Sequence, residues 1–154
     1  MNRYCMPEQP EAPAPATTYE ICDCGPDPFA ININCATLQN QCFRRALWTG
    51  HYLQLTLMCI PVGGEIGLEI HSDTDQFLRL EAGQGMVQMG KCKERVDMQR
   101  CLSKNDVVLV PAETWHNIVN TGRCPLKIYS IYAPPHHPHG TIHRTKAEAD
   151  ESHH

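Results

Sequence analysis

A short stretch of the chain gathers side chains that could do chemistry, directly in front of an apolar run. Within eight residues the sequence places Glu69, His71, Asp73, Asp75 and Gln76. Residues i and i+2 of a β-strand share a face, so Glu69 and His71 project into the same space. Gln76 opens the next apolar segment, and a hairpin between the two segments would bring it to the same point. The stretch therefore predicts a cluster of carboxylate, imidazole and amide groups.

A second element later in the chain can complete this cluster. The segment NDVVLVPAETWHNIVN carries His116 after an apolar strand pattern, with Pro111 ahead of it and Asn120 behind it. A single histidine would be weak evidence for a functional site, but together with Glu69, His71 and Gln76 it indicates one. We expect the fold to bring these four groups, all with lone pairs, together.

The segments that must position these groups have the pattern of short strands. Residues 53–58 alternate between leucines and the side chains of Gln54, Thr56 and Met58, the period expected of a strand. Further strands are predicted at 66–71, 76–83, 85–91, 93–102, 106–111, 116–120 and 126–133, with turn-forming residues between them. So many short strands predict an all-β barrel or sandwich of antiparallel strands.

Three shorter elements are predicted outside this series. FAINI, residues 29–33, has a strand pattern, and NCATLQNQCF, residues 34–43, is expected to form a short helix or turn that Asn34 could cap. TKAEADE, residues 145–151, predicts a small helix near the C-terminus.

The length of 154 residues predicts one folded domain with two flanking segments. Residues 1–28 hold six of the twelve prolines and several acidic residues, and we interpret them as a Pro-rich, Cys-containing arm. Residues 29–135 form the β-barrel domain. Residues 136–154 form a histidine-rich tail, for which a solvated state is expected.

Composition argues against several classes of function. The net charge of -4 and the absence of Lys/Arg clusters argue against nucleic-acid binding. No apolar run approaches the roughly 20 residues that span a bilayer, so no membrane partner is expected. The N-terminus lacks the apolar core of a secretory signal, and we expect a cytoplasmic protein.

The nine cysteines cannot all pair within one chain, and they are scattered. Reduced thiols are the simplest interpretation. Cross-linking between chains, or a small metal or redox role for the N-terminal cysteines that include Cys22 and Cys24, is the alternative.

The two polar elements resemble the paired sequence motifs of the cupin superfamily, G-x5-H-x-H-x3or4-E-x6-G and G-x5-P-x-G-x2-H-x3-N. The positions that match are Gly63, His71, Gly83, Pro111, His116 and Asn120. Glu69 stands where the first motif has a histidine, and Gln76 where it has a glutamate. Asn105 and Glu113 replace the two glycines of the second motif. The resemblance implies a single cupin barrel, a double-stranded β-helix or jelly roll, and small mannose-6-phosphate isomerase-like cupins look closest.

The resemblance also implies one divalent metal ion inside the barrel. Carried over by position, its ligands would be Glu69, His71, Gln76 and His116. Two imidazoles, a carboxylate and an amide oxygen suit Fe(II), Mn(II), Ni(II) or Zn(II). Asp75 or the nearby Asp73 could replace Gln76 as the fourth ligand. The alternative is a cupin that has lost its metal and keeps a hydrogen-bonded polar cluster.

Residues that could line a small-molecule pocket follow from the strand alternation. They are Gln54, Thr56, Gln88 and Tyr132, with Ser130 as a further candidate. The histidine-rich tail follows the last strand and could fold over the barrel mouth. His136, His139 or His143 would then be acid/base groups or part of a second metal site.

The function that the resemblance implies is a metal-dependent cupin acting on a small molecule, a sugar or sugar phosphate, as an isomerase. A non-haem iron dioxygenase and a non-catalytic sugar-binding or structural cupin are the alternatives. The resemblance also implies a homodimer, for which FAINI is a candidate edge strand.

Overall fold

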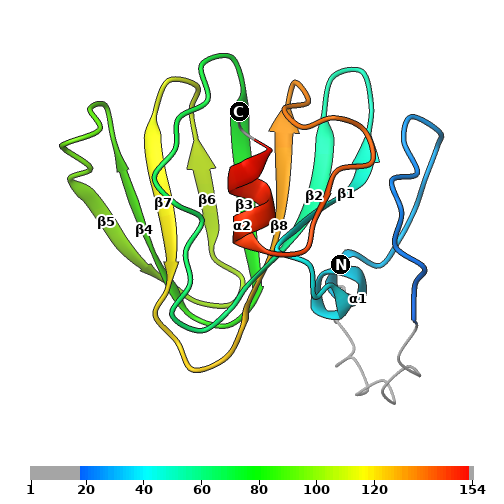
Figure 1. Ribbon diagram of the computed structural model, residues 1–154, viewed down its shortest axis with the longest axis horizontal. Helices are drawn as coiled ribbons and strands as arrows, with labels where there is room; N and C mark the ends of the chain where they lie inside the picture. Colours follow the sequence, from blue (N-terminus) through cyan, green and yellow to red (C-terminus); the bar gives the residue numbers. More distant parts are fainter. Residues whose placement is uncertain (1–17, 153–154) are drawn as a thin grey trace, which may run out of the picture.

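The computed structural model describes residues 18–152 and contains two antiparallel sheets (Figure 1). The larger sheet has the strand order β6-β3-β8-β2-β1-β9, and the smaller has the order β5-β4-β7. The all-β prediction is confirmed.

The helices and strands have the following bounds: α1 Ile33–Gln39, β1 Arg44–Thr49, β2 Gln54–Ile60, β3 Asp75–Ala82, β4 Gly85–Gly90, β5 Met98–Leu102, β6 Val107–Val110, β7 Trp115–Asn120, β8 Leu126–Ala133, β9 Ile142–His143 and α2 Lys146–Glu151. No helix in the described part of the chain has the length and apolar character that crossing a membrane requires.

The interior of the barrel is divided into an apolar end and a polar end. On β2, Gln54, Thr56, Met58 and Ile60 alternate with outward-facing residues and are all fully buried. The apolar end is formed by a core that includes Met58, Ile60, Leu78, Leu80, Val108, Leu126 and Ile128. The polar end is formed by Gln54, Thr56, Gln76, Ser130 and Tyr132, which the strand register places beside one another. It lies where β8 ends, at the top of Figure 1.

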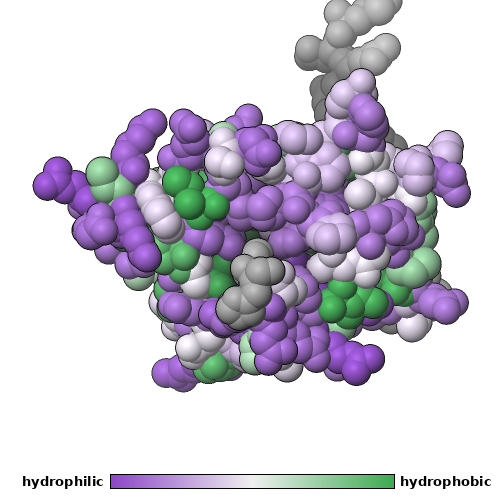
Figure 2. All heavy atoms as spheres, turned by 45° about the horizontal axis from the view of Figure 1, so that its top comes forward, coloured by the Kyte–Doolittle hydropathy of each residue, from purple (hydrophilic) through white to green (hydrophobic). Residues whose placement is uncertain are grey.

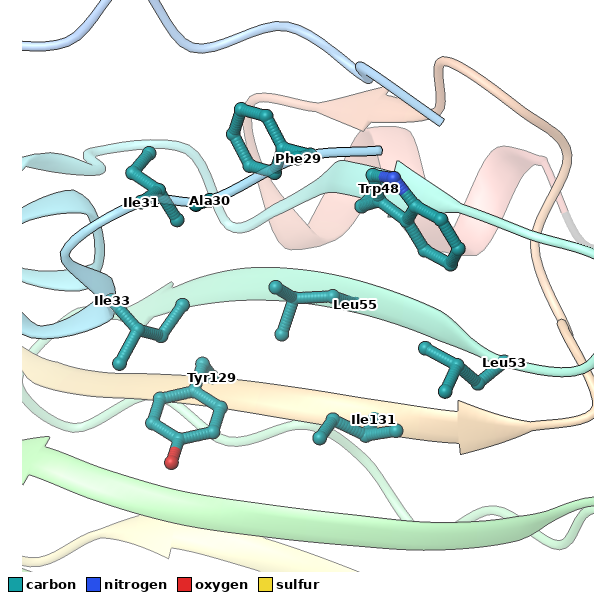
Figure 3. Close-up of a pocket in the computed structure, with 9 residues that line it drawn as sticks. All are labelled: Phe29, Ala30, Ile31, Ile33, Trp48, Leu53, Leu55, Tyr129 and Ile131. Carbon is teal, nitrogen blue, oxygen red and sulfur yellow. The ribbon is translucent and has the colours of Figure 1, made fainter. Parts of the chain in front are cut away.

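Residues 29–32 cover the outer face of the large sheet and form no strand, so the strand prediction for FAINI was wrong. Figure 3 shows Phe29 and Ile31 facing Leu55 and Ile131 across an apolar cavity of about 510 Å³. The segment packs through side chains instead of strand hydrogen bonds, which alternation alone cannot distinguish. Helix α1 begins at Ile33 and is capped by Asn32, whose side chain accepts a hydrogen bond from the Cys35 amide.

The capping role predicted for Asn34 was also wrong, since this residue lies two residues after the cap, Asn32. Asn34 is inside α1, and its amide nitrogen donates a hydrogen bond to Glu81 at 2.6 Å.

Of two predicted strands, one is absent as a named strand and the other is shorter than the sequence pattern suggests. Residues 66–71 form no named strand and make isolated bridges instead, Glu65 with Val119 and Glu69 with His116. Of residues 93–102, only Met98–Leu102 forms a strand, β5. The eight cysteines in the described part of the chain are free thiols, and the sulfurs of Cys22 and Cys24 lie 3.6 Å apart.

The histidine-rich tail packs against the barrel, in contrast to the expected solvated terminus. Strand β9 pairs with β1, and the predicted helix near the C-terminus is present as α2, capped by Thr145. Ala149 of α2 is 2% exposed and belongs to the barrel core. The Asp23 carboxylate accepts hydrogen bonds from the Thr49 and Gly140 amides. It therefore joins the N-terminal segment, β1 and the tail.

We predict that Leu78→Ala lowers the free energy of unfolding by about 2–5 kcal/mol, because it opens a cavity in a core where this side chain is fully buried. The matched control is Leu109→Ala on the neighbouring strand β6, where the side chain is 65% exposed. The control should change the free energy by no more than about 0.5 kcal/mol. Urea unfolding of both variants measures the difference, and equal losses would contradict the placement of the core.

Candidate metal site

Three side chains meet at the polar end of the barrel with their donor atoms facing one another. A donor atom of each of Glu69, His71 and His116 lies within 4.8 Å of the other two. Glu69 Oε1 is 3.4 Å from the Nε2 atoms of both His71 and His116. The histidines are 5% and 1% exposed. The predicted convergence of these three groups is therefore present in the structure.

Backbone hydrogen bonds hold the two motif segments together. The Glu69 amide donates to the His116 carbonyl at 3.0 Å, and the His116 amide donates back to the Glu69 carbonyl at 2.9 Å. The Glu113 amide donates to the His71 carbonyl at 2.7 Å. These bonds join segments far apart in the sequence and bring the three side chains to one point.

The ring of His116 is held with one nitrogen directed at Glu69. Its Nδ1 lies 2.9 Å from the carbonyl oxygen of Thr114. Since a carbonyl can only accept, Nδ1 carries the proton of the neutral ring, and Nε2 keeps its lone pair. This is the arrangement that orients a histidine for a metal ion.

The facing atoms have no hydrogen-bond partner. Glu69 Oε1, His71 Nε2 and His116 Nε2 are all buried and unsatisfied, a state that costs free energy unless another group fills the space between them. Burial alone would raise the pKa of Glu69, but His116, His71 and the charge of Arg44 outweigh it and lower this pKa below its ordinary value. A carboxylate and two imidazole nitrogens around one point form a set that fits a divalent cation.

Gln76 has one free oxygen and lies opposite Tyr132, whose ring centroid is 5.8 Å from that of His71. Its side chain is 3% exposed, and its amide nitrogen donates to Ser130 Oγ at 2.8 Å. The Oε1 atom is buried without a partner. By contrast Asp73 and Asp75 are exposed, and Asp75 accepts a hydrogen bond from the Ala112 amide. Gln76 therefore stays our prediction for the fourth ligand.

The predicted pocket residues lie in different environments. Thr56 and Tyr132 are fully buried, each with an oxygen that lacks a partner, and the Tyr132 ring centroid is 5.8 Å from that of His71. Gln54 is buried, but its amide bonds the backbone of His136 and His137. Gln88 is half-buried and alternates with the inward-facing Val87, so it lies on the outer face of β4, away from the site.

Sequence reasoning gave too little weight to three residues of the site. The ring centroid of His136 is 4.1 Å from that of His71, and the ring centroid of His137 is 5.1 Å from that of Tyr132. Arg44 is 2% exposed. The signal that could have found the histidines is their position directly after the last barrel strand.

Two further histidines of the tail, His139 and His143, lie in other surroundings. His139 is 55% exposed and lies against Asp23 and the Gly25 carbonyl. His143 lies on β9 and pairs with Arg44. Figure 2, turned so that the top of Figure 1 comes forward, shows a mainly hydrophilic surface at this end of the barrel, with hydrophobic patches to either side.

The chain resembles known proteins in sequence and in structure. A family model described as "Cupin domain" matches residues 56–132. The uncharacterized protein YrkC of Bacillus subtilis is 58% identical over 127 residues, which are 82% of this chain and 68% of the relative. The crystal structure of BH2720 from Bacillus halodurans is 56% identical with a TM-score of 0.84, and the match covers 85% of this chain and 99% of that one.

A more distant solved structure shares the fold alone. KdgF from Halomonas sp. is 19% identical with a TM-score of 0.53, over 60% of this chain and 80% of that chain.

We predict that Gln76→Leu weakens Zn²⁺ binding by about tenfold or more, because it removes the buried, unpartnered oxygen that we assign as the fourth ligand. Gln76→Glu should strengthen binding, since a carboxylate is a stronger donor than an amide. The control is Asp75→Asn, which keeps an acceptor for the Ala112 amide and should leave the affinity unchanged. Competition with a chromophoric chelator measures all three affinities. A loss confined to the Asp75 variant would assign the fourth ligand to the aspartate.

Proposed function

The chain belongs to the cupin family, and on this premise we propose that it is a metal-dependent protein that acts on a small molecule. The observation that carries the proposal is the group of Glu69, His71 and His116, whose facing atoms are buried and have no hydrogen-bond partner. Zn(II), Mn(II), Fe(II) and Ni(II) all accept a ligand set of two imidazoles and a carboxylate, completed here by Gln76. If the metal has more coordination positions than these protein ligands fill, a substrate can bind at the remaining ones.

The residues of the chain have separate roles in this proposal. Glu69, His71, His116 and Gln76 hold the metal, and the Thr114 carbonyl fixes the ring of His116. A divalent metal bound there would supply a Lewis acid that polarises a carbonyl or hydroxyl oxygen. The fully buried ring of Tyr132 helps to exclude water from the site.

The reaction that we propose is the isomerisation of a sugar or sugar phosphate, as in the mannose-6-phosphate isomerase-like cupins. Such a reaction needs a base that moves a proton between neighbouring carbons. His136 is our candidate, because it is half-buried and its ring is next to that of His71. His137 is less suited. Burial, Arg44 and His136 lower its pKa to about 2, so it accepts a proton only in strong acid.

A second candidate function is a non-haem iron dioxygenase. The observation that favours it is the composition of the donor group, which is two histidines and one carboxylate. This set with open positions is the ligand set of many Fe(II) oxygenases. A sugar-binding cupin without catalysis is the third possibility, in which the metal or the ligand would bind but nothing would turn over.

We predict that His116→Ala and Glu69→Gln each remove most of the bound metal, since each takes away one of three converging donors. The matched control is His139→Ala, in which the exposed histidine near Asp23 is lost and the metal content should be unchanged. Elemental analysis of untagged protein measures the metal, and circular dichroism checks that the variants fold. Full metal content in both site variants would refute the proposed site.

We predict that the metal-loaded protein exchanges a carbon-bound hydrogen of an aldose or ketose phosphate with D₂O, which NMR detects. His136→Ala should abolish the exchange and keep the metal, because this variant removes the base and none of the ligands. Oxygen uptake by the Fe(II)-loaded protein with diols or thiols, in the absence of hydrogen exchange, would favour the dioxygenase. Neither activity, together with sugar binding, would favour the binding protein.

A homodimer also stays a prediction. Its interface would have to differ from the one first expected, because FAINI is not a strand and the edges of the large sheet are β6 and β9.

A further inference from the structure

A buried positive charge, Arg44, lines the same cavity as Glu69. Arg44 is 2% exposed, and no carboxylate of the described residues forms an ion pair with it. Its Nε atom has no hydrogen-bond partner. A buried guanidinium without an anion is costly, so such a group is expected to have a negatively charged partner when the protein is at work.

Strand register is the reason why Arg44 is inside. Arg44 pairs with Met58, a fully buried residue of the barrel interior, and the two side chains share a face. The next residue, Arg45, points to the other face, where its guanidinium donates to the Ile21 carbonyl at 2.8 Å. The two adjacent arginines therefore differ in environment: Arg44 faces the barrel interior, whereas Arg45 lies on the other face and donates to a backbone carbonyl.

Other buried groups near Arg44 also lack partners. The Tyr132 hydroxyl and the Thr56 hydroxyl are both unsatisfied, and the Thr56 residue lies opposite Ala46, two residues from Arg44 on the same face. Arg44 and Glu69 line one cavity, and the ring centroid of Tyr132 lies 5.8 Å from that of His71, which faces Glu69. A guanidinium and two hydroxyls form a set of hydrogen-bond donors, which suits an anion.

A cavity of about 330 Å³ gives access to this region. Its lining includes Arg44, Glu69, Gly67, Lys146 and Asp150. Lys146 and Asp150 form an ion pair of 2.8 Å on α2, with both side chains substantially exposed, so this part of the cavity is its mouth. The volume is at the low end for ligand sites, which indicates a small molecule.

Charge balance connects this cavity to the proposed metal. Without a metal, the charges of Glu69 and Arg44 cancel. A divalent cation held by Glu69 would leave the metal group with one positive charge, and Arg44 adds a second. A buried region with this excess of positive charge favours an anion, and the metal and the anion should strengthen each other's binding.

We propose that this cavity is a subsite for the anionic group, a carboxylate or a phosphate, of the substrate, and that Arg44 is the residue that recognises it. The inference rests on the proposed function for the substrate and the metal, and it adds the class of substrate: a small organic anion whose charged group lies next to the metal-bound part. Arg44 is then a specificity-determining residue, and it is not a metal ligand.

The test is calorimetric titration of the Zn²⁺-loaded protein with glycolate, inorganic phosphate and the neutral ethylene glycol. Binding of either anion but not of ethylene glycol is expected, and the stronger of the two identifies the anionic group. Arg44→Met should weaken anion binding by about 10- to 100-fold, the range for loss of a charge-assisted hydrogen bond, and leave the zinc content unchanged. The matched control, Arg45→Met, should keep the affinity of the unchanged protein. Arg44→Lys should keep part of it, since the charge remains and the planar fork is lost.

A further experiment requires neither the metal nor an Arg44 variant. In the metal-free protein, Glu69→Gln removes the negative charge that competes for Arg44, so this variant should bind the preferred anion more tightly than the unchanged metal-free protein does. The proposal is overturned if neither anion binds the zinc-loaded protein, if Arg44→Met keeps full affinity, or if Glu69→Gln brings no gain. Failure of the proposed function has a different signature, which is a protein that takes up no metal while its anion binding still depends on Arg44.

Discussion

A carboxylate enclosed between two imidazoles is the constraint on which the rest of this structure depends. Glu69 reaches that position because its backbone and that of His116 exchange hydrogen bonds in both directions. The three facing atoms then have no partner except one another or a bound ion or ligand. Since a buried anion is costly, the surroundings must supply positive charge or hydrogen-bond donors. Arg44 inside β1, and the proposed metal, both follow from that requirement.

The same constraint explains why the barrel interior is divided. Gln76 and Tyr132 lie on adjacent strands at one level, and Leu78 with Ile128 lies deeper along the same strands. Burying the apolar end stabilises the fold, which offsets the cost of a polar end with several unsatisfied atoms. Polar groups that would weaken an ordinary core are tolerated here because a rigid apolar base holds them in place.

Both ends of the chain contribute to closing the polar end. Gln54 fixes the backbone at His136 and His137, and Asp23 bonds both Thr49 of β1 and Gly140 of the tail. Rings from the tail thereby come to lie against His71 and Tyr132. The segment that carries our candidate base and the helix that borders the anion cavity are therefore both parts of the tail, and the site is completed by residues outside the two family motifs.

The sequence by itself determined the class of fold and three of the groups at the centre of the site. Alternation along the strands is local, so it predicts most strands and the shared direction of Glu69 and His71. The motif spacing then points to His116. Local patterns fail where a long-range contact decides the outcome. FAINI has a strand pattern but packs through its side chains. Gln88 is polar, as a pocket residue would be, but it lies on the outer face of β4. Only the tertiary structure placed Arg44 inside and His136 against His71. The register of β1 on β2 sets the first position, and the hydrogen bonds that the His136 and His137 amides donate to Gln54 set the second.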